Sequence, residues 1–261
     1  MTMVVNRRER VRAATVQEIK DVARAQLVTL GPHAVSLRAI AREMGMTAPA
    51  LYRYFPSFDH LVKALVNDMY DEVHAAMVRA RDNVEVGHTQ ADNVKVGHAG
   101  ADNAAAQHSK QRLIAVSQAF RRWAVQHRAE FGLLFDSPRT VGCIAGQESG
   151  TGPSGAARCS YILIEIFEQL WQQQSYVVPA PDETATALLE QLSVYRTAVV
   201  TLLPVGPLNV AMSVWLRIFG LVSLEIFGHI PFAHHNAEAF FSQQLSDIMA
   251  GLDAGLPGTP S

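Results

Sequence analysis

The chain has 261 residues, of which 49% are hydrophobic and 18% are charged. This composition is sufficient for a packed core and excludes a wholly disordered protein. The formal net charge is only −2, but residues 1–63 carry ten basic and five acidic side chains, whereas residues 64–261 carry twelve and nineteen. A basic N-terminal quarter followed by an acidic remainder indicates that the N-terminal segment binds a polyanion and the rest of the chain does not.

Cysteine content and hydropathy predict a cytoplasmic protein. Two cysteines, Cys143 and Cys159, are too few for a disulfide framework and fit a reducing compartment. The N-terminus is rich in arginine and lacks the apolar run of a signal peptide. Residues 197–216 carry no charge over the length of a membrane-spanning helix, but Pro204 and Pro207 at the centre indicate a turn between two buried helices.

Apolar residues recur at helical spacing along most of the chain, and no strand–turn–strand pattern occurs, so the sequence predicts an all-α protein. In the N-terminal part, Gly31 ends the first helix, Ser36 caps the second, and Gly45 separates the second from the third. We expect helices over 11–30, 36–44, 47–54 and 58–80, and then over 112–127, 131–136, 156–174, 182–203, 208–228 and 237–252.

A repeat with a period of ten residues interrupts this helical pattern. Residues 82–88 recur as 92–98 and, in altered form, as 102–108. We interpret the repeat as a mobile linker, because the alternative, a metal site formed by the histidine that ends each copy, lacks close ligand spacing. The predicted organisation is a DNA-binding segment over 1–57, a connecting helix over 58–80, a flexible insertion over 81–110, and a helical ligand-binding and dimerisation domain over 111–255.

Residues 36–55 form two short predicted helices around a glycine turn. This is the geometry of a helix-turn-helix, whose second helix enters the major groove of DNA. The second helix starts with small residues and ends with Tyr52, Arg53 and Tyr54, whose polar groups suit phosphates and base edges. Two ordinary core helices are the alternative; the basic surplus of the segment and its arginine-rich N-terminal arm favour the DNA-binding interpretation.

Three segments here resemble the DNA-binding domain of the tetracycline-repressor (TetR) family: Ser36-Leu37-Arg38-Ala39-Ile40-Ala41, Gly45-Met46-Thr47, and Leu51-Tyr52-Arg53-Tyr54-Phe55-Pro56-Ser57. The resemblance implies a homodimeric, repressor-type regulator, not an enzyme, whose C-terminal helices bind a small molecule and release DNA. It also implies the DNA-binding residues, which are Arg38, Thr47, Ala48, Pro49, Tyr52, Arg53, Tyr54 and Lys63. The family usually opens its fourth helix with a lysine; this chain has Phe58, so we expect one phosphate contact to be missing.

A looser resemblance lies downstream. Residues 120–131 and 215–229 are similar to the WHG-type subtype of the family's ligand-binding domain, in which the last two long helices form a four-helix dimer interface. Helices 208–228 and 237–252 occupy those places, although their apolar faces suit an ordinary core equally well.

Aromatic side chains on the C-terminal helices are the candidates for an effector pocket. The apolar stretches hold few charges, which favours a hydrophobic or amphipathic effector. The alternative, that the rings are plain core, remains open. The candidates are Trp123, Phe131, Phe135, Phe167, Trp171, Tyr195 and Trp215.

The strongest rival signal is a glycine pattern over 150–155 that matches a dinucleotide-binding fingerprint. That site requires a strand–helix–strand unit, which is missing from the surrounding sequence, so we expect a loop and no cofactor. A helical enzyme or ligand carrier with a non-functional helix-turn-helix is the alternative function, and no catalytic motif supports it.

Overall fold

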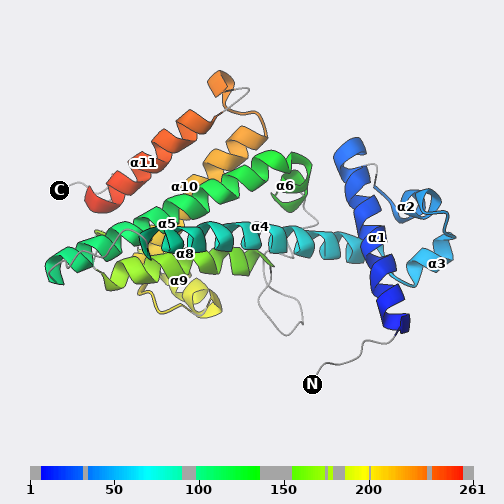
Figure 1. Cartoon of the computed structure of the whole chain (residues 1–261), viewed down its shortest axis with the longest axis horizontal. Helices are drawn as coiled ribbons and strands as arrows, with labels where there is room; N and C mark the ends of the chain where they lie inside the picture. Colours follow the sequence, from blue (N-terminus) through cyan, green and yellow to red (C-terminus); the bar gives the residue numbers. More distant parts are fainter. Residues whose placement is uncertain are drawn as a thin grey trace. The chain divides into compact units, whose positions relative to one another are not determined.

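The computed structural model describes residues 7–31, 35–89, 98–135, 155–173, 176–178, 186–199, 201–233 and 237–254. Within these ranges every regular element is a helix (Figure 1), which confirms the all-α prediction. The chain forms two compact units. The first comprises residues 1–72 and 127–156, and the second comprises 73–126 and 157–261.

The first unit contains α1 (Arg7–Leu30), α2 (Leu37–Glu43), α3 (Ala48–Tyr52), the first part of α4 (Phe58–Thr89) and α6 (Arg128–Phe135). The ends of these helices follow from local chemistry. The Ser36 hydroxyl accepts a hydrogen bond from the Ala39 amide at 3.2 Å, which caps α2. Gly45 has φ +65°, a left-handed conformation that glycine adopts without steric cost, and it turns the chain from α2 to α3.

The core of the first unit joins all of its helices. Its most deeply buried side chains include Ile19, Leu27, Ile40, Leu51, Leu61, Met69 and Phe131. Arg24 of α1 adds a polar link, because its Nε donates to Glu130 of α6 at 3.0 Å and its Nη2 donates to Glu72 of α4 at 2.9 Å. Short helix α6, which the sequence placed with the C-terminal helices, therefore packs with the N-terminal ones.

The second unit contains the end of α4, α5 (His98–Gln126), α8 (Gly155–Gln172), α9 (Thr186–Val199), α10 (Val205–Ile226) and α11 (Glu238–Ala254), with a short 3-10 turn at Pro231–Ala233. Helix α10 packs against α5, α9 and α11. The apolar core lies between these helices and includes Leu113, Phe120, Phe167, Val214, Ile218 and Leu245.

Helix α10 is, by length and composition alone, long and apolar enough to cross a membrane, with a mean hydropathy of 1.5 over its most apolar window. Only 39% of that window is buried. One face is core, and the opposite face leaves Leu216, Leu224 and the adjoining Phe227 exposed. The predicted turn around Pro204 is present, since α9 ends at Val199 and α10 begins at Val205.

Helices extend further into the repeat segment than its sequence indicated. Helix α4 continues to Thr89 and α5 begins at His98, earlier than the predicted start at residue 112. Alanine is common from residue 99 to 106, and it is the strongest helix former. Residues 90–97 and the side chains of 85–103, with His88 and His98, lie outside the described part, so the linker interpretation stays a prediction.

Candidate nucleic-acid interface

The turn between α2 and α3 is closed by main-chain hydrogen bonds. The Gly45 amide donates to the Arg42 carbonyl at 3.2 Å, and the Met46 amide donates to the Ala41 carbonyl at 2.8 Å. Leu51 of α3 is fully buried and Phe55, just beyond it, is 6% exposed. These two anchors fix one side of α3 in the core and therefore determine which side chains of the helix face solvent.

Most of the predicted DNA-binding residues are exposed side chains of α2, of α3 or of the residues next to α3. Arg38, Pro49 and Arg53 are exposed, and Tyr52 is 45% exposed. Thr47 occupies the N-cap position of α3 but makes no capping hydrogen bond with its side chain, so its exposed hydroxyl is not used to begin the helix. The predicted residues from 47 to 53 thus share one short exposed segment, and Ala48 is partly buried within it.

Tyr54 joins this segment to α1. The Arg12 guanidinium lies over the Tyr54 ring, 5.3 Å from its centroid, and its Nη2 donates to the Arg53 carbonyl at 3.4 Å. A guanidinium over an aromatic face is an attractive cation–π arrangement. No local sequence pattern indicates this contact, because 41 residues separate Arg12 from Arg53.

The start of α4 differs from the rest of the interface. The Ser57 hydroxyl accepts from the His60 amide at 3.3 Å and so caps the helix. Phe58 is the first residue of α4 and is partly buried. Because it is phenylalanine, there is no cation at the position where the family usually has lysine. Lys63 is also partly buried, one turn and a half further along.

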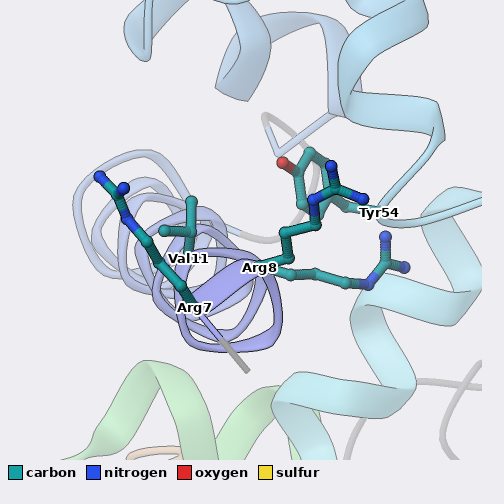
Figure 2. Close-up of a pocket in the computed structure, with 5 residues that line it drawn as sticks. Arg7, Arg8, Val11 and Tyr54 are labelled. Atoms are coloured by element: carbon teal, nitrogen blue, oxygen red, sulfur yellow. The ribbon is translucent and has the colours of Figure 1, made fainter. Parts of the chain in front are cut away.

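Arginines at the start of α1 line a hollow of about 490 Å³ beside Tyr54 (Figure 2). Its lining consists of Arg7, Arg8, Val11, Arg12 and Tyr54. Figure 2 shows Arg7 extending away from Tyr54, so the basic groups spread across the end of the helix. The arginine-rich arm was evident in the sequence, but its individual residues were missing from the predicted interface.

The predicted effector residues fall into separate aromatic clusters. In the first unit, Phe131 and Phe135 have ring centroids 4.6 Å apart, and Tyr70 meets Phe135 edge-on at 6.1 Å. In the second unit, Trp215 packs against Phe120 at 5.0 Å. The structure therefore brings some candidates together but adds partners, Tyr70 and Phe120, that the sequence did not single out.

A third cluster, in the second unit, contains a buried polar group. Tyr176 lies 5.7 Å from Phe167 and 6.0 Å from Trp171, measured between ring centroids. It is 7% exposed, and no hydrogen bond joins its hydroxyl to any residue that the structure describes. Burial raises the pKa of Tyr176 above its ordinary value. Tyr176 was missed because a single tyrosine in a short connection carries no sequence signal.

The remaining candidates lie on α5 and α9. Trp123 is 5% exposed and belongs to the core of the second unit. Tyr195 is partly buried beside Ser160 and Tyr161 of α8; burial raises its pKa, Tyr161 adds to the increase, and a hydrogen bond with Ser160 opposes it. Among the described side chains, no three histidine, cysteine, aspartate or glutamate residues form a group suited to a metal ion.

Two family models match the chain. Residues 19–65 match the model described as bacterial regulatory proteins of the tetR family, and residues 113–248 match the tetracyclin repressor-like C-terminal domain. The chain is 34% identical over 137 residues to the HTH-type transcriptional regulator Rv1816 of Mycobacterium tuberculosis strain ATCC 25618 / H37Rv. That match covers 52% of this chain and 50% of Rv1816, so the chain spans about half the length of the curated relatives it matches.

Two solved structures share the arrangement of the helices. The protein SCO4313 aligns with a TM-score of 0.64 and 26% identity, over 94% of this chain and 100% of that chain. A protein with unknown function from Rhodococcus sp. RHA1 aligns with a TM-score of 0.59 and 16% identity, over 91% of this chain and 95% of that chain. The second likeness shows the fold alone.

Proposed function

Because the chain belongs to the TetR family of bacterial regulatory proteins, we propose that it is a transcriptional repressor that binds duplex DNA through α2 and α3. The observation that carries this proposal is the two-sided character of α3: Leu51 is fully buried, whereas Tyr52 and Arg53 beside it are exposed. A helix that packs one side into the core and exposes polar side chains on the other is typical of the recognition helix of a helix-turn-helix.

Each polar group of the segment has a proposed role. Hydroxyls and exposed guanidinium groups donate hydrogen bonds to phosphate oxygens, and the residues nearest the start of the recognition helix reach base edges. Arg53 is the strongest candidate for reading a base, because arginine pairs with guanine through two hydrogen bonds. The proposed phosphate-binding residues are Arg38, Thr47, Tyr52, Tyr54 and Lys63, and the proposed base-proximal residues are Ala48, Pro49 and Arg53.

The DNA-binding proposal is tested with duplexes that the wild-type protein enriches from a random pool. In fluorescence anisotropy, Arg53→Ala is expected to weaken binding by about 1–3 kcal/mol and to relax preference at one position. Tyr52→Ala is expected to weaken all sequences alike. Arg122→Ala, at an exposed position on α5, is the matched control. Failure of the wild type to enrich any sequence would contradict the proposal and favour an effector-binding protein with a non-functional helix-turn-helix.

We also propose a homodimer that presents two recognition helices to successive major grooves, roughly 34–36 Å apart or a multiple of that distance. Support comes from α10, where Leu216 is 61% exposed, Leu224 is 45% exposed and Phe227 is 39% exposed. Their spacing of eight and three residues places them on one face of the helix. Exposed apolar side chains that share one face of a helix are typical of a surface that another subunit covers.

Light scattering coupled to size exclusion tests the dimer. Leu224→Glu introduces a charge into the proposed interface and is expected to give a monomer with unchanged helical content. Val194→Glu on α9 is the control, since Val194 is 75% exposed and lies on another helix. Dimers of equal stability for both variants would rule out α10 as the interface.

The effector proposed for the second unit is a small, largely apolar molecule with one hydrogen-bonding group. The aromatic cluster of Phe167, Trp171 and Tyr176 supports it, because the buried Tyr176 hydroxyl forms no hydrogen bond with the described part of the chain. Such a hydroxyl has not recovered there the hydrogen bond that it lost on leaving water. Release from DNA then follows from tighter binding of the effector to the state that does not fit the operator. Tyr176→Phe is expected to weaken effector binding without affecting binding of DNA.

A further inference from the structure

We propose that the first two turns of α1 form a second DNA-binding element, in which Arg7, Arg8 and Arg12 bind backbone phosphates beside the segment that α3 contacts. This inference rests on the proposed function, since it adds a contact to the same DNA complex. It assigns a role to a hollow whose lining, apart from Tyr54, lies on α1 and outside the helix-turn-helix.

The structure ties this element to the recognition segment. Arg12 donates to the main-chain carbonyl of Arg53 at 3.4 Å and lies over the ring of Tyr54 at 5.3 Å. Arg53 and Tyr54 directly follow α3. A duplex that meets the exposed end of α3 is therefore within reach of α1, and the position of α1 is already set before DNA binds. Preorganised contacts of this kind lose less entropy on binding than a loose arm does.

The chemistry of the hollow suits a phosphate. Three of its five lining residues are arginines, and guanidinium groups bind phosphate through paired hydrogen bonds. None of the lining residues is acidic. Glu9 and Arg10 share the same turns and are exposed without lining the hollow, so residues 7–12 carry four arginines against one glutamate.

Two further features favour DNA over other polyanions. The hollow belongs to the basic part of the chain, since residues 1–63 carry ten basic and five acidic side chains. Val11, 58% exposed, offers an apolar surface between the guanidinium groups, and such a surface suits the sugar of a nucleotide. The alternative ligand of this hollow is an acidic protein, and the following test distinguishes it from DNA.

The test compares Arg7→Gln/Arg8→Gln with Arg122→Gln/Arg196→Gln, which removes the same charge from exposed positions on α5 and α9. The probe is a fluorescein-labelled duplex enriched from a random pool by the wild type, titrated between about 50 and 200 mM KCl. Each lost phosphate contact lowers the slope of log K against log salt by about 0.9, so two arginines in each of two subunits lower it by nearly four. The control variant is expected to keep the wild-type slope.

Neutral DNA provides a second measurement that does not depend on the folding of the variant. Replacing phosphates that flank the enriched site with methylphosphonates is expected to weaken the wild type about tenfold or more. The glutamine variant is expected to be insensitive to the same replacement, because the contact is already gone. Arg7→Lys/Arg8→Lys, which keeps the charge, is expected to keep most of the salt dependence.

The possible results separate the inference from the function on which it rests. If the wild type enriches no duplex, the proposed function fails. If it does, and the glutamine variant binds with the wild-type slope and responds equally to methylphosphonates, the arginines do not bind phosphate and the inference is overturned. In that case the hollow is left for an acidic protein partner, whose binding the glutamine variant would weaken while leaving DNA affinity intact.

Discussion

Removal of either partner of the buried Arg121–Glu225 ion pair is expected to destabilise the second unit strongly. Arg121 of α5 donates from Nε and Nη2 to the two carboxylate oxygens of Glu225 on α10, both at 2.7 Å. The two side chains are only 8% and 6% exposed. The pair therefore joins two helices in a place that water barely reaches.

The magnitude follows from what a single substitution leaves behind. Glu225→Gln removes the carboxylate that pairs with a buried guanidinium, and breaking a buried ion pair by removal of one partner costs about 3–5 kcal/mol. Glu238, a second carboxylate near Arg121, lies 3.7 Å away and is 70% exposed, so it replaces little of the lost interaction. For a domain of 150–250 residues, this cost corresponds to a decrease in Tm of about 6–20 °C.

Urea denaturation followed by circular dichroism, at fixed protein concentration, measures the effect. Arg121→Met and Glu225→Gln are compared with the double variant Arg121→Met/Glu225→Leu, which removes both charges. We expect the double variant to be more stable than either single variant, because no unpaired charge remains.

The matched control is Glu165→Gln, which breaks the ion pair with Arg81 at 2.7 Å, where the carboxylate is 48% exposed. Its expected cost is about 0–1 kcal/mol. Equal small losses for Glu165→Gln and Glu225→Gln would refute the reasoning, as would a double variant whose loss equals the sum of the two single losses.

Three further changes test other features of the fold. Gly45→Ala is expected to lower the free energy of unfolding, measured by urea denaturation, by about 1–2 kcal/mol. The cause is the φ of +65°, since no atom lies close to the new Cβ. An unchanged free energy of unfolding would contradict this reason. Glu130→Gln, which weakens the 3.0 Å contact with Arg24, is expected to cost about 1.5–3 kcal/mol, and an unchanged midpoint would show that Glu72 alone holds Arg24. Burial raises the pKa of Tyr176, so the tyrosine ionises first in the unfolded chain and the free energy of unfolding falls as pH rises above about 10. Tyr176→Phe is expected to reduce that loss and to leave stability near neutral pH unchanged or higher. Identical pH profiles for the variant and the wild type would contradict this prediction.

The helix-turn-helix was predictable because its signals are local. Ser36 caps α2 and Gly45 adopts a left-handed conformation, as predicted, and Ile40 and Leu51 on either side of the turn are both fully buried. Each of these features depends on residues a few positions apart. A short segment therefore holds enough information to define its own turn.

Contacts between distant segments were not predictable in the same way. Glu130 lies 106 residues from Arg24, and Glu225 lies 104 residues from Arg121. Which aromatic rings meet depends on how each helix is rotated about its axis, and a single sequence does not state that rotation. For this reason the predicted effector residues divide into clusters, and Tyr176 was missing from the prediction.

The hydrogen bond from Arg12 to the Arg53 carbonyl bears on which substitutions this protein tolerates during evolution. Arg12 binds the main-chain oxygen of Arg53 and not its side chain. Any residue at position 53 offers the same oxygen, so replacement of Arg53 leaves this anchor intact. The position proposed to read a base is thus free to vary without loss of this contact. Under the proposed function, single substitutions at position 53 change the preferred DNA sequence while the surrounding structure persists.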